Sequence, residues 1–311
     1  TADGEAVVDI LAAALHFADE EPEILAATMA MLEAGEEAFD LARDLASESE
    51  AEDNSTSIIP LSDVKLLSPV PRPGSIRDCL AFERHLIQAT RTIASWKAPT
   101  LVALDRGMER LFGRGFLRPP PVWYERPIYY KGNPNSVVGH DADIQWPSFS
   151  KRLDFELEFG IFIGKAGRNI PASKANEYIA GYSLFNDFSA RDTQAAEMAG
   201  RLGPAKSKDF DTGNSIGPWL VTPDEVPDEI TLRARVKGEE WSSGSSSEMH
   251  FSFSEIIEYI SRDETLHPGD FIGSGTVPGG CGLEIDRWLQ PGDIVELEAD
   301  ALGVLRNRIV S

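Results

Sequence analysis

The sequence predicts an α+β protein that is mostly β, in which a small N-terminal α/β module (residues 1–65) precedes a larger domain (residues 66–311). Twenty prolines and 26 glycines among 311 residues favour a turn-rich β architecture over a helical bundle. Residues 229–237 alternate polar and apolar side chains with a period of two, which is typical of a strand with one buried face. Apolar side chains at helical spacing between residues 24 and 45 place helices in the N-terminal module.

Within the N-terminal module, residues 5–11 predict a short strand, and residues 22–45 predict helix that is interrupted at Gly35. The acidic residues at 19–21 and 23 suit the positive end of a helix dipole. Residues 47–57 are polar and predict a linker or a long loop. No residue pattern in the module indicates chemistry, so we expect it to be a structural accessory.

Net charge is unevenly distributed and argues against two classes of partner. The formal net charge is −22, of which residues 1–57 contribute −15, from 16 acidic side chains against Arg43 alone. So acidic a surface disfavours nucleic acid and anionic membranes as partners. The sequence has no run of 18 apolar residues and no signal-peptide pattern. Two cysteines, Cys79 and Cys281, cannot form a disulfide framework, so we expect a cytoplasmic protein. Thr at position 1 indicates a trimmed N-terminus.

The larger domain is expected to begin with an extended, proline-punctuated segment up to residue 74, followed by a helix and loop and then by strands joined by turns. Residues 87–120 predict a mobile helix and loop over a site, with glycine hinges at 107, 113 and 115. The aromatic run at 123–132 predicts either a pocket wall or core packing. Beyond it we expect a strand over 154–164, a helix over 175–180, strands over 181–185 and 229–237, a Ser-rich turn over 240–248, a helix over 254–260, and strands that begin at 271 and 294 after Pro-Gly-Asp turns.

The strand at 154–160 carries the first sign of chemistry. Alternation places Asp154, Glu156 and Glu158 on one face of the strand. One interpretation is a half-buried strand with a solvated acidic face. The next residues, 161–164, are apolar on both faces, however, as expected of a strand that enters a core. Neighbouring carboxylates beside a core repel each other unless a cation lies between them. We therefore predict a hard divalent metal held by Glu156 and Glu158.

A second polar cluster follows the next predicted strand. Asp187 stands at the end of that strand, where it is well placed as a third carboxylate ligand. Three carboxylates suit Mg²⁺, Mn²⁺ or Ca²⁺ far better than Zn²⁺. Arg191 and Gln194 are three residues apart, so on a helix they share a face and could bind an anion. Alone, Lys208 indicates a solvated loop lysine and His85 a structural histidine.

Several short motifs, each weak alone, occur in an order that resembles the fumarylacetoacetate hydrolase family over roughly residues 70–300. The motifs are the E-x-E strand (Glu156, Glu158), N-D-x-S-A-R-D-x-Q (186–194), K-D-F-D-T (208–212), G-P-W (217–219), G-S-G-T (273–276) and C-G-L-E (281–284). The resemblance implies a β-sandwich or β-roll of mixed sheets with the site at its mouth, and a homodimer.

The resemblance also implies roles for individual residues. It places Glu156, Glu158 and Asp187 on the metal, with Lys208 close by and with Asp78 and Thr212 as further members of the metal site. It places Arg191, Gln194, Thr276 and Tyr130 on the substrate. Cys281 we expect to be a small packed residue and not a nucleophile.

The branch of the family is indicated by Asp78, His85 seven residues later, and Glu284, which resemble the pattern of the long hydrolases. The short decarboxylases and isomerases resemble H-x-x-E instead. This chain has Gln88 in place of that Glu, although Glu83 could substitute for it. Position 80 is Leu, where the hydrolases often carry an aromatic residue. This difference predicts a substrate whose shape differs from that of fumarylacetoacetate.

The predicted function is metal-dependent hydrolysis of a C–C bond in a 1,3-diketo acid such as an acylpyruvate. His85, oriented by Glu284, would activate water, while Arg191, Gln194 and Lys208 would stabilise the oxyanion and the metal the enolate leaving group. The first alternative is a metal-dependent decarboxylase or tautomerase of a 2-oxo acid such as oxaloacetate. The second is a non-catalytic ligand-binding relative.

Overall fold

A computed structural model describes residues 4–18, 22–54 and 56–311, so the acidic residues at 19–21 lie outside the described part. In the N-terminal module, strand β1 (Ala6–Val8) pairs antiparallel with β2 (Ile58–Pro60) beside the helices α1 (Ile10–Ala18), α2 (Thr28–Ala34) and α3 (Glu36–Ala51). The 3₁₀ turns Glu23–Leu25 and Leu61–Asp63 complete it.

Two predictions for this module are wrong. The expected strand over 5–11 ends early because the carboxylate of Asp9 accepts from the N–H of Ala12 (3.0 Å) and caps a helix that begins at Ile10. Residues 47–51 belong to α3 and not to a loop. There the Ser47 hydroxyl donates to the carbonyl of Arg43 (2.8 Å), one turn back, so the polar residue remains in the helix.

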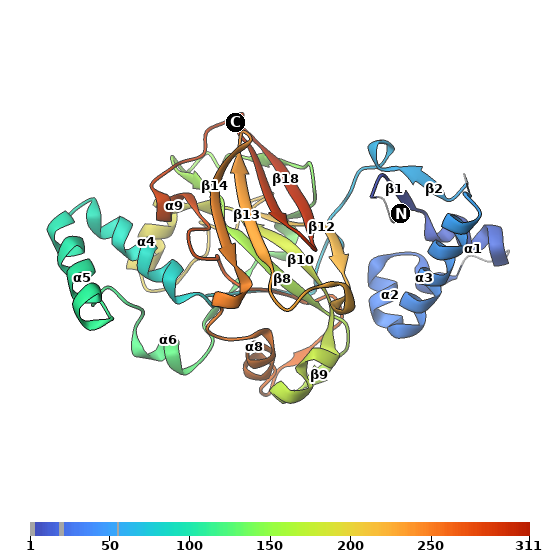
Figure 1. Ribbon diagram of the computed structural model, residues 1–311, viewed down its shortest axis with the longest axis horizontal. Coiled ribbons are helices and arrows are strands. Elements are labelled where there is room, and N and C mark those ends of the chain that lie inside the picture. Colours follow the sequence, from blue (N-terminus) through green and yellow to red (C-terminus); the bar gives the residue numbers. More distant parts are fainter. Residues whose placement is uncertain (1–3, 19–21, 55) are drawn as a thin grey trace.

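The larger domain is built on two mixed sheets that pack face to face (Figure 1). The seven-stranded sheet has the order β4 (Tyr129–Gly132), β3 (Ile76–Cys79), β16 (Phe271–Gly273), β8 (Leu157–Ile163), β10 (Ile179–Asp187), β12 (Asn214–Val221), β5 (Val137–Val138). The five-stranded sheet has the order β14 (Glu239–Ser245), β13 (Thr231–Val236), β17 (Ile294–Ala299), β18 (Gly303–Val310), β6 (Asp143–Gln145). Two short pairs, β7 (Leu153–Asp154) with β11 (Ser189–Ala190) and β9 (Gly167–Arg168) with β15 (Thr265–Leu266), lie outside them.

The α+β class and the mixed, curled sheets are thereby confirmed. Side chains of β8, such as Phe159 and Ile161, and side chains of β13 and β17, such as Leu232 and Leu297, form one buried core between the sheets. The opposite face of the seven-stranded sheet packs on the N-terminal module, where Leu32 lies in one apolar cluster with strand residues.

The remaining helices are α4 (Glu83–Ser95), α5 (Pro99–Phe112), α6 (Pro121–Glu125), α7 (Arg191–Ala199), α8 (Phe253–Ile260) and α9 (Gly282–Ile285). The predicted Ser-rich turn at 240–248 is wrong, because Glu239–Ser245 forms the edge strand β14, where small polar side chains can face water. The helix expected at 175–180 is a 3₁₀ turn, Ala172–Tyr178, and β10 begins directly after it at Ile179. Further 3₁₀ turns span Pro134–Ser136, Pro223–Glu225 and Ser246–Glu248.

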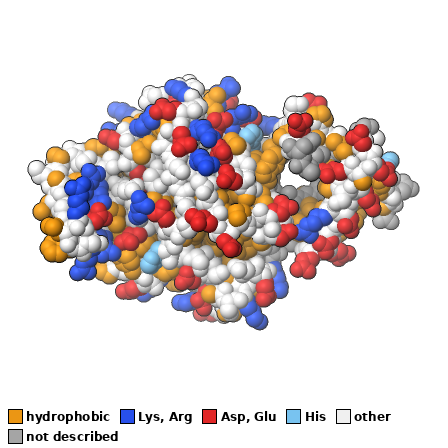
Figure 2. Space-filling view, in the orientation of Figure 1, with side chains coloured by type: hydrophobic (Ala, Val, Ile, Leu, Met, Phe, Trp, Pro, Cys, Tyr) orange, Lys and Arg blue, Asp and Glu red, His pale blue; other side chains and the backbone are white. Residues whose placement is uncertain are grey.

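The surface charge differs between the N-terminal module and the larger domain. In the space-filling view, acidic side chains gather on the N-terminal module, whereas the larger domain shows both signs of charge (Figure 2). Within the described ranges, no helix is both long and apolar enough to cross a membrane.

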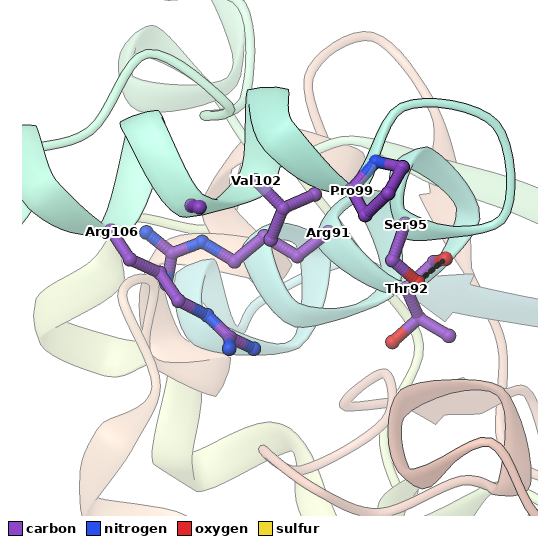
Figure 3. Close-up of a pocket in the computed structure, with 7 residues that line it drawn as sticks. Arg91, Thr92, Ser95, Pro99, Val102 and Arg106 are labelled. Carbon is purple, nitrogen blue, oxygen red and sulfur yellow. Dashed lines mark hydrogen bonds between the residues drawn. The ribbon is translucent and has the colours of Figure 1, made fainter.

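Helices α4 and α5 form a hairpin that projects from the sheets (Figure 1), and side chains of both helices line a shared pocket (Figure 3). A largely buried ion pair holds the hairpin together. Arg91 of α4 donates from Nε and NH2 to Asp105 of α5 (2.7 and 2.6 Å), and NH2 also reaches Glu109 (2.9 Å). Asp105 is fully buried and also accepts from the N–H groups of Phe116 and Leu117. Asp105 therefore ties together both helices and the loop that follows α5.

Asp105→Asn is expected to lower the free energy of unfolding by about 3 kcal/mol, because Arg91 would remain largely buried with only the exposed carboxylate of Glu109 as a charged partner. Glu109→Gln removes the outer, 43% exposed partner of the same arginine. This control is expected to cost less than about 1 kcal/mol. Urea denaturation of both variants measures the difference, and similar small losses would contradict the role assigned to Asp105.

Candidate metal and substrate site

Three carboxylates meet at one end of the seven-stranded sheet. Asp78 on β3, Glu158 on β8 and Asp187 at the end of β10 are buried, and their ligand oxygens lie within 4.8 Å of one another. They share the face of the sheet that also carries Phe162 and Phe185, because every second residue of a strand points to the same side. Their meeting therefore depends on the register of strands that are distant in the sequence.

Gly273 makes this meeting possible. Strand β16 lies between β3 and β8, and Gly273 pairs with Asp78 on one side and with Gly160 on the other. A Cβ atom at position 273 would lie 2.4 Å from Asp78 Oδ1, and the N–H of Gly275 donates to the same oxygen (3.1 Å). The missing side chain leaves the space through which the Asp78 carboxylate extends over β16 toward Glu158.

The three carboxylates retain unused acceptor atoms. Thr276 donates to Glu158 Oε1 (3.1 Å), whereas Glu158 Oε2 and Asp187 Oδ1 are buried and find no hydrogen-bond partner among the described residues. Burial, reinforced by the charge of Asp187, raises the pKa of Asp78 to about 8. Burial likewise raises the pKa of Asp187 to about 6 and the pKa of Glu158 well above its usual value. A divalent cation would supply both the missing partner and the missing positive charge. Three carboxylates fit Mg²⁺, Mn²⁺ or Ca²⁺.

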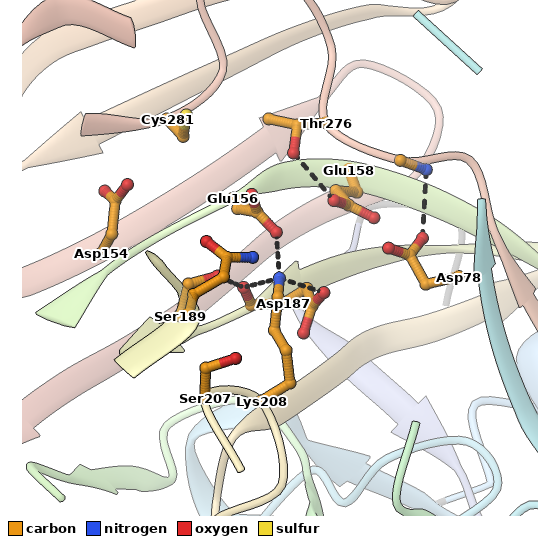
Figure 4. Close-up of polar contacts among 12 residues, drawn as sticks. Asp78, Asp154, Glu156, Glu158, Asp187, Ser189, Ser207, Lys208, Thr276 and Cys281 are labelled. Atoms are coloured by element: carbon orange, nitrogen blue, oxygen red, sulfur yellow. Dashed lines mark hydrogen bonds and ion pairs between the residues drawn. The ribbon is translucent and has the colours of Figure 1, made fainter. Parts of the chain in front are cut away.

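Glu156 lies beside this set and contacts two cations of the chain, and its role as a metal ligand stays a prediction. Its Oε1 accepts from Arg191 (2.8 Å) and its Oε2 accepts from Lys208 Nζ (Figure 4). Burial alone would raise the pKa of Glu156, but these two cations lower it below its usual range. The chain's own cations thus balance the charge of Glu156, and among the described residues Asp78, Glu158 and Asp187 form the carboxylate cluster that could hold a metal.

The interpretation of 154–158 as a solvated acidic face is wrong. Asp154, Glu156 and Glu158 are each at most 4% exposed. Asp154 accepts from Arg191 Nε (2.7 Å) and from the backbone N–H of Gly282 (2.8 Å), so it anchors the arginine and the start of α9. Asp154 therefore supports Arg191 and α9, and it is not one of the three carboxylates that could hold a metal.

Arg191 and Gln194 share the first turns of α7, as their spacing predicts. Arg191 NH1 donates to Gln194 Oε1 (2.9 Å), and the same guanidinium also contacts Asp154 and Glu156. Arginine has five N–H donors, so these bonds leave N–H groups free to reach a substrate anion. The arginine is therefore both part of the scaffold and a candidate substrate contact.

Lys208 lies at the centre of the polar cluster and not in solvent. It is 4% exposed, and its ammonium contacts the carboxylates of both Glu156 and Asp187 (Figure 4). Tyr130 donates to the same oxygen, Asp187 Oδ2 (2.6 Å), and its ring lies 5.7 Å from the ammonium. Lys208 thus connects the carboxylate that it shares with Arg191 to the candidate metal ligands.

His85 and Glu284 form a hydrogen-bonded pair, as their place in the motifs predicts. His85 Nδ1 lies 2.7 Å from Glu284 Oε1, and the other oxygen of Glu284 accepts from the N–H of Gly279 (2.8 Å). An ionised carboxylate can only accept, so Nδ1 carries the proton and Nε2 is free to act as a base. Cys281 also contacts Glu284 Oε1 (3.5 Å), and burial raises the pKa of its thiol. It is a packed thiol, although a histidine does lie beside it.

These groups surround a cavity of about 560 Å³. The predicted residues on its wall are Asp78, His85, Tyr130, Glu156, Glu158, Arg191, Gln194, Lys208 and Thr276. Thr212 is not among them, and its hydroxyl accepts from the N–H of Gln145 (3.0 Å). The place of Thr212 at the metal site stays a prediction.

The wall also contains residues that belong to none of the sequence motifs. Leu86 and Ile93 of α4, Met198 of α7, and Arg152 line the outer part of the cavity. In the sequence, the helical spacing of apolar residues after His85 could have indicated Leu86 and Ile93.

The site can be compared with known proteins. The family model described as fumarylacetoacetate hydrolase, C-terminal, matches residues 104–310. The oxaloacetate tautomerase YisK of Bacillus subtilis is 31% identical over 255 residues, which are 80% of this chain and 74% of that protein.

Solved structures of similar fold include a 5-carboxymethyl-2-hydroxymuconate delta-isomerase from Mycobacterium smegmatis, with TM-score 0.62, 27% identity, and coverage of 82% of this chain and 84% of that one. They also include a fumarylacetoacetate hydrolase from Exiguobacterium antarcticum, with TM-score 0.63, 27% identity, and coverage of 82% and 81%.

Proposed function

The chain belongs to the fumarylacetoacetate hydrolase family, and on this premise we propose that it is a divalent-metal-dependent enzyme that hydrolyses a C–C bond in a 1,3-diketo acid. The observation that carries the proposal is the His85–Glu284 hydrogen bond of 2.7 Å, with His85 on the cavity wall close to the buried carboxylates. It provides an oriented base for water, which tautomerisation or decarboxylation does not need.

The residues supply the following steps. A divalent cation at Asp78, Glu158 and Asp187 supplies Lewis-acid polarisation of substrate oxygens when it is bound. Free N–H groups of Arg191 and the amide of Gln194 hold the acid end of the substrate. His85 Nε2 takes a proton from water, whose oxygen attacks the distal carbonyl, and Glu284 stabilises the imidazolium that forms. The C–C bond then breaks, and the imidazolium returns the proton to the departing carbon.

A second candidate is a tautomerase or decarboxylase of a 2-oxo acid such as oxaloacetate. The 31% identity to an oxaloacetate tautomerase favours it. The same carboxylates would serve such a reaction, since both routes pass through an enolate. A non-catalytic relative is disfavoured by the complete set of charged residues. The cytoplasmic location and the homodimer expected from the sequence stay predictions.

Parallel assays of the purified protein with Mg²⁺ test the proposal. We expect hydrolysis of an acylpyruvate to its two carboxylic products, and a lower kcat/KM for conversion of oxaloacetate. Turnover of oxaloacetate together with no cleavage of any acylpyruvate would contradict hydrolysis and favour the second candidate.

A further inference from the structure

The outer half of the cavity is apolar, in contrast to its charged inner end. Helices α4 and α7 both run from the inner end toward the surface. On α4, exposure increases from 6% at His85 to 46% at Ile93. On α7, it increases from 7% at Arg191 to 55% at Met198. Each helix therefore begins with a polar residue of the site and ends with an exposed apolar residue that lines the same cavity.

The length of this apolar section exceeds what a small acid needs. With a rise of about 1.5 Å per residue, the distance along α4 from His85 to Ile93 is about 12 Å. The cavity volume of about 560 Å³ lies in the range typical of sites for drug-sized ligands. A compact acid such as oxaloacetate would occupy the charged end and leave the walls of the outer half in contact with water alone.

The composition of the outer wall indicates what fills it. It is formed by Leu86, Ala89, Ile93 and Trp96 on one side and by Met198 and Leu283 on others. Three of the apolar side chains that line the cavity remain strongly exposed, namely Ile93, Trp96 and Met198. Exposed apolar surface that surrounds a cavity is typical of a binding site for an apolar group. Two charged residues also belong to the exposed part of the wall. The carboxylate of Asp192 accepts from the Ser150 hydroxyl (2.5 Å) and the Lys151 N–H (2.8 Å). The guanidinium of Arg152 stacks on Trp96 (5.1 Å) and Trp288 (4.9 Å).

We propose that the substrate carries a bulky apolar substituent, an aryl or long alkyl group, on the side of the molecule opposite its oxo-acid end. Ile93 and Met198 are the specificity-determining residues that contact this substituent from the two helices. The inference rests on the proposed function, because the oxo-acid end must bind at the carboxylates and Arg191 for the substituent to point outward. The stacking of Arg152 on two indoles places a flat, largely apolar surface at the mouth, which suits an aryl group.

Oxamates separate the two parts of this inference, since an oxamate resembles a 2-oxo acid but has no carbon–carbon bond of the type that is cleaved. Calorimetric titration of the protein in the presence of Mg²⁺ compares oxamate, N-benzyloxamate and N-oxalylglycine. We expect N-benzyloxamate to bind at least about tenfold more tightly than oxamate, because its ring is removed from water. N-oxalylglycine, which carries a second carboxylate, is expected to bind no more tightly than oxamate.

Variants of the outer wall test whether Ile93 and Met198 contact the apolar substituent. Ile93→Asn and Met198→Asn are each expected to reduce the affinity ratio between N-benzyloxamate and oxamate toward one. Leu104→Asn is the matched control, because Leu104 is 58% exposed on α5 and does not line the cavity, so its ratio should equal that of the unmodified protein.

The remaining outcomes of the titrations each contradict either the apolar substituent or the proposed function. Equal affinities for oxamate and N-benzyloxamate, or tighter binding of N-oxalylglycine than of both, would overturn the apolar substituent and leave the proposed function intact. Failure of every oxamate to bind in the presence of Mg²⁺ would overturn the proposed function, and the substituent with it.

Discussion

Replacing His85 with alanine is expected to lower kcat for an acylpyruvate by about 10²- to 10⁴-fold, which is the usual contribution of a positioned general base. His85 faces the cavity, and its Nδ1 is occupied by Glu284 (2.7 Å), so Nε2 is the basic atom available to water. The variant should still bind Mg²⁺, because the oxygens that we assign to the metal belong to three other residues. Steady-state kinetics, combined with Mg²⁺ titration, separates the loss of a base from the loss of the metal.

Two further variants show whether the pair acts as a unit. Glu284→Gln keeps an acceptor for Nδ1 but removes the charge that stabilises the imidazolium, so we expect a smaller loss than for His85→Ala. His140→Ala is the control, because His140 lies on a different surface, where its Nδ1 accepts from the N–H of Arg306 (3.2 Å). A His85→Ala enzyme that cleaves the acylpyruvate at the normal rate would disprove the mechanism.

The sequence predicts which residues form the site better than it predicts which of them contact one another. Strand periodicity identified Glu158, and the end of a strand identified Asp187, because both positions follow from local patterns. The approach of Asp78 to these two carboxylates, which only the family resemblance implied, could not be predicted from local patterns. It depends on the register that brings β3 next to β16 and β8, and on Gly273, whose missing side chain leaves room for the Asp78 carboxylate. Strands β3 and β16 are nearly 200 residues apart in the sequence, so their register depends on the assembly of the whole sheet and not on a local pattern.

The pairing of charges was also beyond local patterns. Lys208 comes from a loop, and its ammonium reaches two buried carboxylates on different strands. Only the assembled sheets exclude water from this lysine and convert a residue that looks solvated into part of the site. In the N-terminal module, by contrast, the errors were local. The cap formed by Asp9 was visible in the sequence but competed with a strand-like apolar run.

Glu158→Gln is expected to abolish the stabilisation of the protein by Mg²⁺. In the metal-free protein, burial raises the pKa of Glu158 well above its usual value, so replacing this carboxyl group with a neutral amide should leave the melting temperature unchanged or higher. A ligand at 100 times its Kd adds about 2.7 kcal/mol to the free energy of unfolding, and the variant should lose this gain. Differential scanning calorimetry with and without Mg²⁺ measures it. Glu240→Gln, on the exposed edge of the five-stranded sheet, is the control and should keep the full gain.

The same carboxylates predict how the stability of the metal-free protein depends on pH. The pKa of Asp78 is raised from 3.8 to about 8 and that of Asp187 from 3.8 to about 6, mainly by burial. Between about pH 4 and about pH 8 the folded state therefore holds more protons at these groups than the unfolded state does, so their contribution to the free energy of unfolding falls as pH rises.

Asp78→Asn isolates this contribution, because asparagine does not titrate. The melting temperature of the metal-free unmodified protein should fall more steeply across this pH window than that of the variant. Mg²⁺ must displace the bound protons, so its stabilising effect should increase over the same window in the unmodified protein. Equal pH slopes for the two metal-free proteins would show that Asp78 is ionised without a cation. The three carboxylates would then not form a site that needs a metal to balance its charge.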